Sequence, residues 1–341
     1  MKYGFIGLGN MAGAIIAGMA ACGKFKNDYL YGFNRSQGKT LALKEKHGLI
    51  PCASAAEVAE KADVIILAVK PQVLPEVMPE IAKGITKDKT VISIAAGKSI
   101  GWYEERLAKG VPVVRCMPNI NAKVKASVTA ICGGKGATAD DIKIADGIFA
   151  SVGKIYHIEE KMFPAFGALG GASGAFVLLY IDALAEAGVR AGFSRPMAEE
   201  IATATVMGSS ALAMDSDEHP IALMNRVCSP GGTTVEGVCK LKELGFETAV
   251  QQALRAIIDK DLFLEALCCP YGYGYCCFPV RNYRQNHGCL AQRKCDAESC
   301  AAPRRGEHCS PDCYCFVSSS RSGNRNNRIR DCVNAPQKRR Y

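Results

Sequence analysis

The sequence predicts an α/β protein: a doubly wound sheet followed by an all-helical domain. Three observations predict it. Short apolar runs alternate with helical segments through about residue 155. A glycine-rich turn joins the first apolar run to the first helix. From residue 156 to about 267 the spacing of apolar residues is helical throughout, which indicates a second domain without strands.

The first domain is predicted to cover residues 1–155. The run DVIILAV (63–69) is continuously apolar, as is typical of a strand buried on both faces of a parallel sheet. The alternation of strands with helices favours a doubly wound arrangement. The expected strands are 2–7, 30–34, 63–69, 90–95, 112–117 and 127–132, and the expected helices are 10–22, 37–46, 55–61, 74–83 and 100–108.

The second domain is predicted to cover residues 156–267. Its long apolar stretch, 161–192, is rich in Ala and Gly, and such helices pack closely against other helices. An interlocked homodimer is therefore expected, so this is a dimerisation domain. The remaining helices are expected at 196–214, 218–227, 234–244 and 246–266.

Composition indicates a cytoplasmic protein that binds neither membranes nor nucleic acid. Residues 1–261 carry 29 Lys and Arg against 27 Asp and Glu, so this part offers no basic surface for nucleic acid. Its six scattered cysteines fit a reducing compartment and are expected to be small packing residues. We expect no stretch of the ~18–20 apolar residues that span a membrane. The glycine spacing near the N-terminus argues against a signal peptide.

Residues 268–341 form a tail rich in Cys and Arg. Eleven of the 17 cysteines lie in residues 262–341. A metal site, a disulfide module and an RNA-binding arm were weighed, but the cysteine spacing lacks paired C-x₂-C motifs and no metal site is predicted. We interpret the tail as a disordered or aberrant extension that can be deleted without loss of activity.

The turn Gly7-Leu8-Gly9-Asn10-Met11 is the first candidate site. It follows the first strand and opens the first helix, where Gly7 permits a tight turn and Gly9 lets the backbone approach a pyrophosphate. Ala12 stands at the third glycine position. The strand–turn–helix context favours a Rossmann-type dinucleotide site over a turn without a ligand.

The end of the second strand bears on which dinucleotide binds. NAD-preferring sites usually carry an acidic residue there, but this chain has Asn34-Arg35-Ser36. A guanidinium and a hydroxyl suit a 2′-phosphate, so NADPH is the expected cofactor, with NADH as the alternative.

Two further segments are expected to line the nicotinamide half of the cleft. Ala68-Val69-Lys70-Pro71 ends one strand and Ala95-Ala96-Gly97 ends the next. Ligands of open α/β sheets lie at the carboxyl ends of strands. For Lys70 and Arg35, an ordinary solvated charge remains the alternative interpretation.

The segment Ser229-Pro230-Gly231-Gly232-Thr233-Thr234 lies between two predicted helices. Pro and paired Gly set a tight loop, and Thr233 or Thr234 is expected to cap the next helix. Backbone N–H groups and two hydroxyls at a helix N-terminus suit a carboxylate. A capped turn with no ligand is the alternative.

Taken together, these motifs resemble those of the pyrroline-5-carboxylate reductases over about residues 1–260. The resemblance rests on G-x-G-N-M-A, N-R-S, A-V-K-P-Q, M-P-N (117–119) and S-P-G-G-T-T, in that order. It implies reduction of 1-pyrroline-5-carboxylate to L-proline, with Thr234 at the imine nitrogen. Ser229, Gly231, Gly232, Thr233 and Thr234 would then bind the substrate.

The resemblance also implies a homodimer or a higher homo-oligomer, up to a decamer, with sites that use two chains. The chain departs from the family at Ala55, which replaces an Asn, at Ile120-Asn121, and at 171–176. We expect these changes to alter affinity more than reaction type. Two alternatives are a β-hydroxyacid dehydrogenase, against which the absence of Lys from 162–189 counts, and a non-catalytic NADP(H)-binding regulator.

Overall fold

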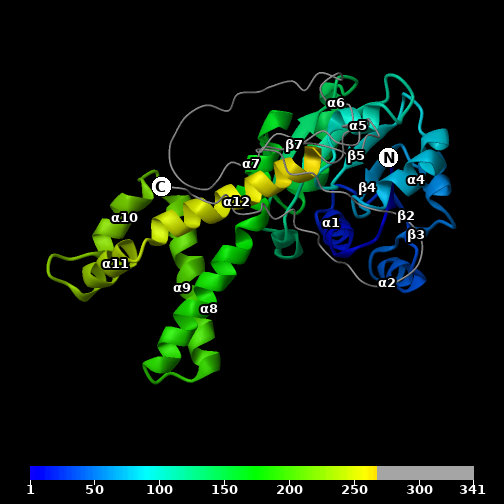
Figure 1. Ribbon diagram of the computed structural model, residues 1–341. Helices are drawn as coiled ribbons and strands as arrows, with labels where there is room; N and C mark the ends of the chain where they lie inside the picture. Colours follow the sequence, from blue (N-terminus) through cyan, green and yellow to red (C-terminus); the bar gives the residue numbers. More distant parts are fainter. Residues whose placement is uncertain (267–341) are drawn as a thin grey trace, which may run out of the picture. The chain divides into compact units, whose positions relative to one another are not determined.

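The computed structural model describes residues 1–266, and the tail interpretation therefore lies outside the described residues. Eight strands form one sheet of order β3-β2-β1-β4-β5-β6-β7-β8, in which β6 and β7 are antiparallel and the other neighbours parallel (Figure 1). The strands are Lys2–Ile6 (β1), Tyr29–Phe33 (β2), Ile50–Pro51 (β3), Val64–Leu67 (β4), Thr90–Ser93 (β5), Val113–Met117 (β6), Ser127–Gly133 (β7) and Gly153–His157 (β8).

Helices cover both faces of this sheet. Side chains alternate along β4, so that Val64 and Ile66 join one core and Ile65 and Leu67 the other. The first core is completed by α1 and α6, and the second by α3, α4 and α5. The helices of this domain are Asn10–Ala21 (α1), Gln37–His47 (α2), Ala55–Lys61 (α3), Leu74–Ile81 (α4), Ile100–Glu104 (α5) and Ala139–Ala150 (α6), with 3₁₀ turns at Ala82–Gly84 (η1) and Ile120–Val124 (η2).

The predicted fold class is confirmed, but β3, α6 and β8 were not predicted. β8 pairs on one side only, with β7, and its Lys154, Tyr156 and His157 side chains are exposed. An edge strand of this kind shows no apolar run in the sequence. It ends at His157, so the proposed boundary at residue 155 lies within it. The start of α6 does carry a recognisable signal, the capping box of Thr138 and Asp141.

The stretch 161–192 was predicted as one long helical stretch; it is helical from Glu160 to Arg190, but the type of helix changes along it. It comprises the 3₁₀ turn Glu160–Met162 (η3), Phe163–Phe166 (α7), the π-helical segment Gly167–Ala172 (η4) and Gly174–Arg190 (α8). Two contacts tie the π-helical segment η4 to the end of β6 and the start of η2. Asn119 Nδ2 donates a 2.7 Å hydrogen bond to the Gly170 carbonyl. A Cβ on Gly167 would lie 3.1 Å from Met117 Sδ, so glycine accommodates the close approach of this methionine.

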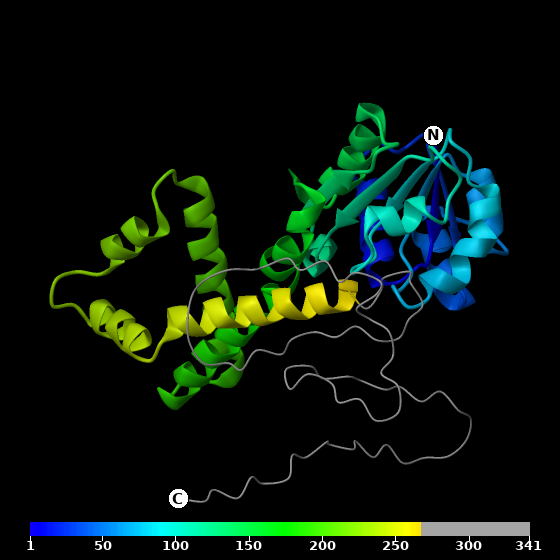
Figure 2. The ribbon, with the colours of Figure 1, turned by 45° about the horizontal axis from the view of Figure 1, so that its top comes forward.

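The other helices are Arg195–Asp215 (α9), Pro220–Val227 (α10), Thr233–Glu243 (α11) and Phe246–Ala266 (α12). Helices α8 and α9 lie side by side (Figure 2), with Ala185, Ala198 and Ala202 buried between them. Most large apolar side chains of α8 remain exposed, including Leu178 at 66% and Leu179 at 69%. One copy of the chain therefore leaves a broad apolar helix surface uncovered.

The expectation that no segment is apolar enough to span a membrane was wrong. By length and composition, Glu160–Arg190 qualifies, and only 17% of its apolar window is buried. The expectation that the cysteines are small packing residues holds only in part. Cys52 and Cys116 are buried, whereas Cys22 and Cys239 are exposed.

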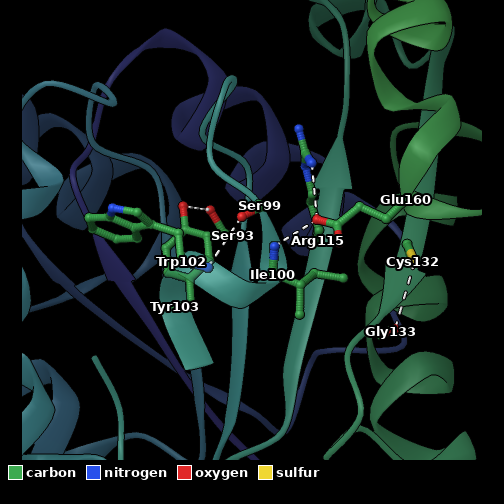
Figure 3. Close-up of polar contacts among 9 residues, drawn as sticks. All are labelled: Ser93, Ser99, Ile100, Trp102, Tyr103, Arg115, Cys132, Gly133 and Glu160. Carbon is green, nitrogen blue, oxygen red and sulfur yellow. Dashed lines mark hydrogen bonds and ion pairs between the residues drawn. The ribbon is translucent and has the colours of Figure 1, made fainter. Parts of the chain in front are cut away.

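A buried arginine fastens the start of the helical segment to the sheet (Figure 3). Arg115 of β6 is 2% exposed, and its Nη1 donates to Glu160 Oε1 at 3.0 Å. The same carboxylate oxygen accepts from the Ile100 backbone N–H at 2.6 Å, at the start of α5. The guanidinium also lies 4.3 Å from the centroid of the Phe163 ring. Glu160 thus joins β6, α5 and the helical segment at one point.

We predict that Glu160→Ala lowers the free energy of unfolding by about 2–3 kcal/mol, because a buried guanidinium loses its carboxylate. Urea denaturation at fixed protein concentration measures the loss. Glu159→Ala is the matched control. Its exposed pair with Lys161 at 2.5 Å should contribute less than about 0.5 kcal/mol. Equal losses in the two variants would contradict the assignment.

Candidate functional site

Backbone hydrogen bonds align the carboxyl ends of β2, β1, β4 and β5 with one another. Gly7 N–H donates to the Phe33 carbonyl, Ala68 N–H to Ile6, and Ile94 N–H to Leu67, at 2.9, 2.9 and 3.1 Å. From β1 the chain adds β2 and then β3 on one side of β1, and it then crosses to add β4 on the other side. The direction in which strands are added therefore reverses between β1 and β4. Ligands of open α/β sheets lie at this switch point.

The glycine turn at this point has the geometry that its sequence predicts. Gly7 adopts φ +93°, and a Cβ there would lie 2.8 Å from Val69 and 2.9 Å from the Ala68 backbone. Gly9 is the N-cap of α1, and Ala12 packs in the core. The turn therefore requires glycine at position 7 for both its conformation and its contact with β4.

The residues at the start of α1 fit a pyrophosphate. A Cβ built on Gly9 would meet no atom within 4 Å, so the space above the helix N-terminus is open. The N-cap has no side-chain hydrogen bond, and the first turn of α1 contains no acidic residue. The first N–H groups of a helix lack intrahelical partners and favour anions.

The three residues after β2 differ in what their side chains contact. Asn34 Oδ1 accepts from the Leu8 N–H at 3.1 Å, and its Nδ2 donates to the Ser36 carbonyl at 3.1 Å. Its side chain thus ties the glycine turn to the end of β2. Arg35 is exposed, and Ser36 is the N-cap of α2 without a side-chain hydrogen bond. Both side chains can reach a ligand at this edge.

The segments after β4 and β5 lie at the same edge. Ala68 and Val69 are half-buried, whereas Lys70 is exposed, and Pro71 follows before α4. Gly97 adopts φ +67° after Ala95 and Ala96. The segment 95–97 rests on a polar support that the sequence analysis missed. Ser93 Oγ is 2.6 Å from Tyr103 Oη (Figure 3), and it accepts a hydrogen bond from the Ala95 N–H at 3.2 Å. Burial raises the pKa of Tyr103 to about 12, so its hydroxyl stays protonated.

The loop before α11 is tight, but the expected threonine cap is wrong. Gly232 is the N-cap of α11, and Thr233 and Thr234 are its first two helical residues. Gly232 N–H donates to the Ser229 carbonyl at 3.0 Å, and Gly231 adopts φ +68°. The N-cap Gly232 has no side chain, and Thr233 and Thr234 are exposed, so the N–H groups at the start of α11 and both hydroxyls are accessible.

The departures from the family pattern also have defined positions. Ala55 is buried as the first residue of α3, whose N-cap Ser54 accepts from the Glu57 N–H at 3.1 Å. Ile120 is 63% exposed at the start of η2. Asn119, just before it, is buried and joins η2 to η4 through hydrogen bonds to Asn121 and Gly170. This role was not predicted, because the partner carbonyl lies 51 residues away.

The structure therefore brings the proposed cofactor residues together at one sheet edge and places Ser229–Thr234 at the start of α11. The hydrogen bonds described for that loop stay within α10 and the loop itself, as in Cys228 N–H to Met224 at 3.2 Å and Gly232 to Ser229. Among the described residues, no cluster of His, Cys, Asp and Glu could hold a metal ion.

Two protein-family descriptions match the two parts of the chain. Residues 2–97 match "NADP oxidoreductase coenzyme F420-dependent", and residues 160–263 match "Pyrroline-5-carboxylate reductase dimerisation". The pyrroline-5-carboxylate reductase of Escherichia coli K12 is 38% identical over 260 residues, which cover 76% of this chain and 97% of that protein.

Solved structures agree with this similarity. The 1-pyrroline-5-carboxylate reductase of Streptococcus pyogenes has a TM-score of 0.69 at 34% identity, covering 76% of this chain and 98% of that one. The Plasmodium falciparum pyrroline carboxylate reductase, solved with NADP bound, has a TM-score of 0.69 at 31% identity and covers 78% and 98%.

We predict that Gly9→Ala weakens NADP⁺ binding about tenfold or more, because the new methyl occupies the open space over the start of α1. The fold should be retained, since that methyl meets no protein atom within 4 Å. Titration calorimetry measures the affinity. Gly147→Ala, also free of contacts within 4 Å but on α6, is the control and should bind normally. Unchanged affinity in Gly9→Ala would contradict the site.

Proposed function

Because the chain belongs to the pyrroline-5-carboxylate reductase family, we propose that it reduces 1-pyrroline-5-carboxylate to L-proline with NADPH, the last step of proline synthesis. The observation that carries the proposal is the start of α11 in the Ser229–Thr234 loop, where the N-cap Gly232 has no side chain and the first N–H groups offer a site for a small carboxylate. The proposed NADPH site at the edge of the sheet would hold the second reactant.

The cofactor residues have distinct proposed roles. The N-terminus of α1 with Gly7, Leu8, Gly9, Asn10 and Met11 would hold the pyrophosphate. Asn34 would fix this turn, and Arg35 with Ser36 would bind the 2′-phosphate. Residues 68–71 and 95–97 would line the nicotinamide end. When bound, NADPH supplies a hydride. The NADP-bound Plasmodium falciparum relative supports this assignment.

In the proposed reaction the imine carbon accepts the hydride while the π electrons of the C=N bond move to nitrogen, which takes up a proton from solvent to complete the N–H bond of the amine. A protonated imine is the better electrophile, so a hydrogen bond at nitrogen promotes the transfer. Thr234 lies in the first turn of α11, and its exposed hydroxyl can make this contact. Catalysis then depends on orientation and local electrostatics more than on a dedicated acid or base.

Substrate binding is assigned to the same helix start. Ser229, Gly231, Gly232 and Thr233 would hold the carboxylate through hydroxyl and backbone N–H groups. Gly231 needs its left-handed conformation to turn the chain toward α11. The partial positive charge at the helix N-terminus adds to the attraction for the anion.

We propose that a second copy of the chain covers α8 and α9 and completes each site. These helices expose large apolar side chains that a single chain leaves in water. The dimerisation family matched over residues 160–263 supports a protein partner rather than lipid for the apolar span Glu160–Arg190. The homodimer is the proposed unit, and the family resemblance implies higher assemblies up to a decamer. Sedimentation velocity measures the size of the assembly.

We place the enzyme in the cytoplasm, where its free thiols would stay reduced.

The test of this function is turnover with purified chain, pyrroline-5-carboxylate and NADPH, with proline identified as the product. A β-hydroxyacid dehydrogenase would instead oxidise a hydroxy acid with NADP⁺, and a binding regulator would bind NADPH without turnover. The absence of Lys from residues 162–189 counts against the dehydrogenase. Binding without proline formation would contradict the proposal.

We predict that Thr234→Val lowers kcat/KM for pyrroline-5-carboxylate about 10- to 100-fold, because a hydrogen-bond donor to the reacting nitrogen is lost. Thr234→Ser keeps the hydroxyl and should recover most of the activity. The affinity for NADPH should stay unchanged in both variants. Equal activity of the Val and Ser variants would exclude a role for the hydroxyl.

A further inference from the structure

The charged group opposite Arg35 is Glu76. Arg35 follows β2, and Glu76 lies in the first turn of α4, which follows β4. Glu76 Oε2 is 4.0 Å from Arg35 Nη2, and the side chains are 73% and 83% exposed. Since β2 and β4 flank β1 on either side, this pair lies across the edge where the glycine turn opens.

We propose that Glu76 limits the preference for NADPH over NADH. This inference rests on the proposed function, in which Arg35 and Ser36 bind the 2′-phosphate. The Glu76 carboxylate repels that phosphate and competes with it for Arg35. Toward NADH the same carboxylate, reaching across from α4, acts as an acceptor for the ribose 2′-hydroxyl, the role that an acidic residue after the second strand has in NAD-preferring sites.

The surroundings of Arg35 otherwise favour an anion. Ser36, the N-cap of α2, makes no side-chain cap hydrogen bond, and the first turn of α2 contains Lys39 and no acidic residue. A phosphate monoester carries a charge of about −1.5 to −2 at pH 7. A phosphate that contacts the Arg35 guanidinium therefore comes close to Glu76, whose charge has the same sign.

The size of the effect follows from the exposure of the pair. Exposed charge pairs contribute about 0.2–1 kcal/mol, and about 1.4 kcal/mol corresponds to tenfold. Glu76→Gln should therefore raise the ratio of kcat/KM for NADPH to that for NADH about 1.4- to fivefold. The increase should shrink with added salt, because the Debye length is about 8 Å at 0.15 M ionic strength.

The experiment compares full-length wild-type protein, Glu76→Gln and the control Glu45→Gln. Glu45 lies near the other end of α2 and is also exposed, so its substitution makes the same change in net charge away from Arg35. The proposal requires the ratio to rise in Glu76→Gln alone. An unchanged or lower ratio, or an equal rise in Glu45→Gln, would overturn it.

Calorimetric titration of the same proteins with NADP⁺ and NAD⁺ separates this inference from the function on which it rests. The ratio of the two dissociation constants does not require turnover. If the wild-type chain fails to reduce pyrroline-5-carboxylate, the proposed function fails, and the Glu76 proposal is still decided by whether Glu76→Gln shifts that ratio toward NADP⁺.

Discussion

The proposed cofactor site depends on one constraint: the carboxyl ends of the parallel strands are aligned at the same edge of the sheet. Hydrogen bonds from Gly7 to Phe33 and from Ala68 to Ile6 hold β2 and β4 at equal height on either side of β1. This alignment brings residues far apart in sequence to one edge. It also explains why Gly7 cannot carry a side chain, since the Ala68 backbone lies only 2.9 Å from the position of its Cβ.

The second domain poses a different problem, because its helices cannot bury their own apolar surface. Helices α8 and α9 meet through small residues, and Leu178 and Leu179 face outward. The segment that leads to them is fastened to the sheet by Arg115 with Glu160 and by Asn119 with Gly170. One end of the helical domain is thus fixed to the nucleotide-binding sheet, and its apolar surface remains available to a second chain.

Much of this could be predicted from local sequence, where apolar runs and glycines report directly on structure. The glycine turn and α12 match their predicted positions closely. The errors arise where tertiary contacts decide. Asn119 and Met117 contact η4, where the helix changes type, β8 is a polar edge strand, and Gly232 caps α11 in place of a threonine. The Ser93–Tyr103 support is also invisible locally, since neither residue belongs to a motif.

The central claim is that this chain transfers a hydride from NADPH to the imine carbon of pyrroline-5-carboxylate. Its most direct test uses NADPH deuterated at the transferred position of the nicotinamide, with the product analysed by mass spectrometry and NMR. The account predicts L-proline with one deuterium at the carbon that was doubly bonded to nitrogen. Unlabelled proline, or no proline while NADPH still binds, would contradict it.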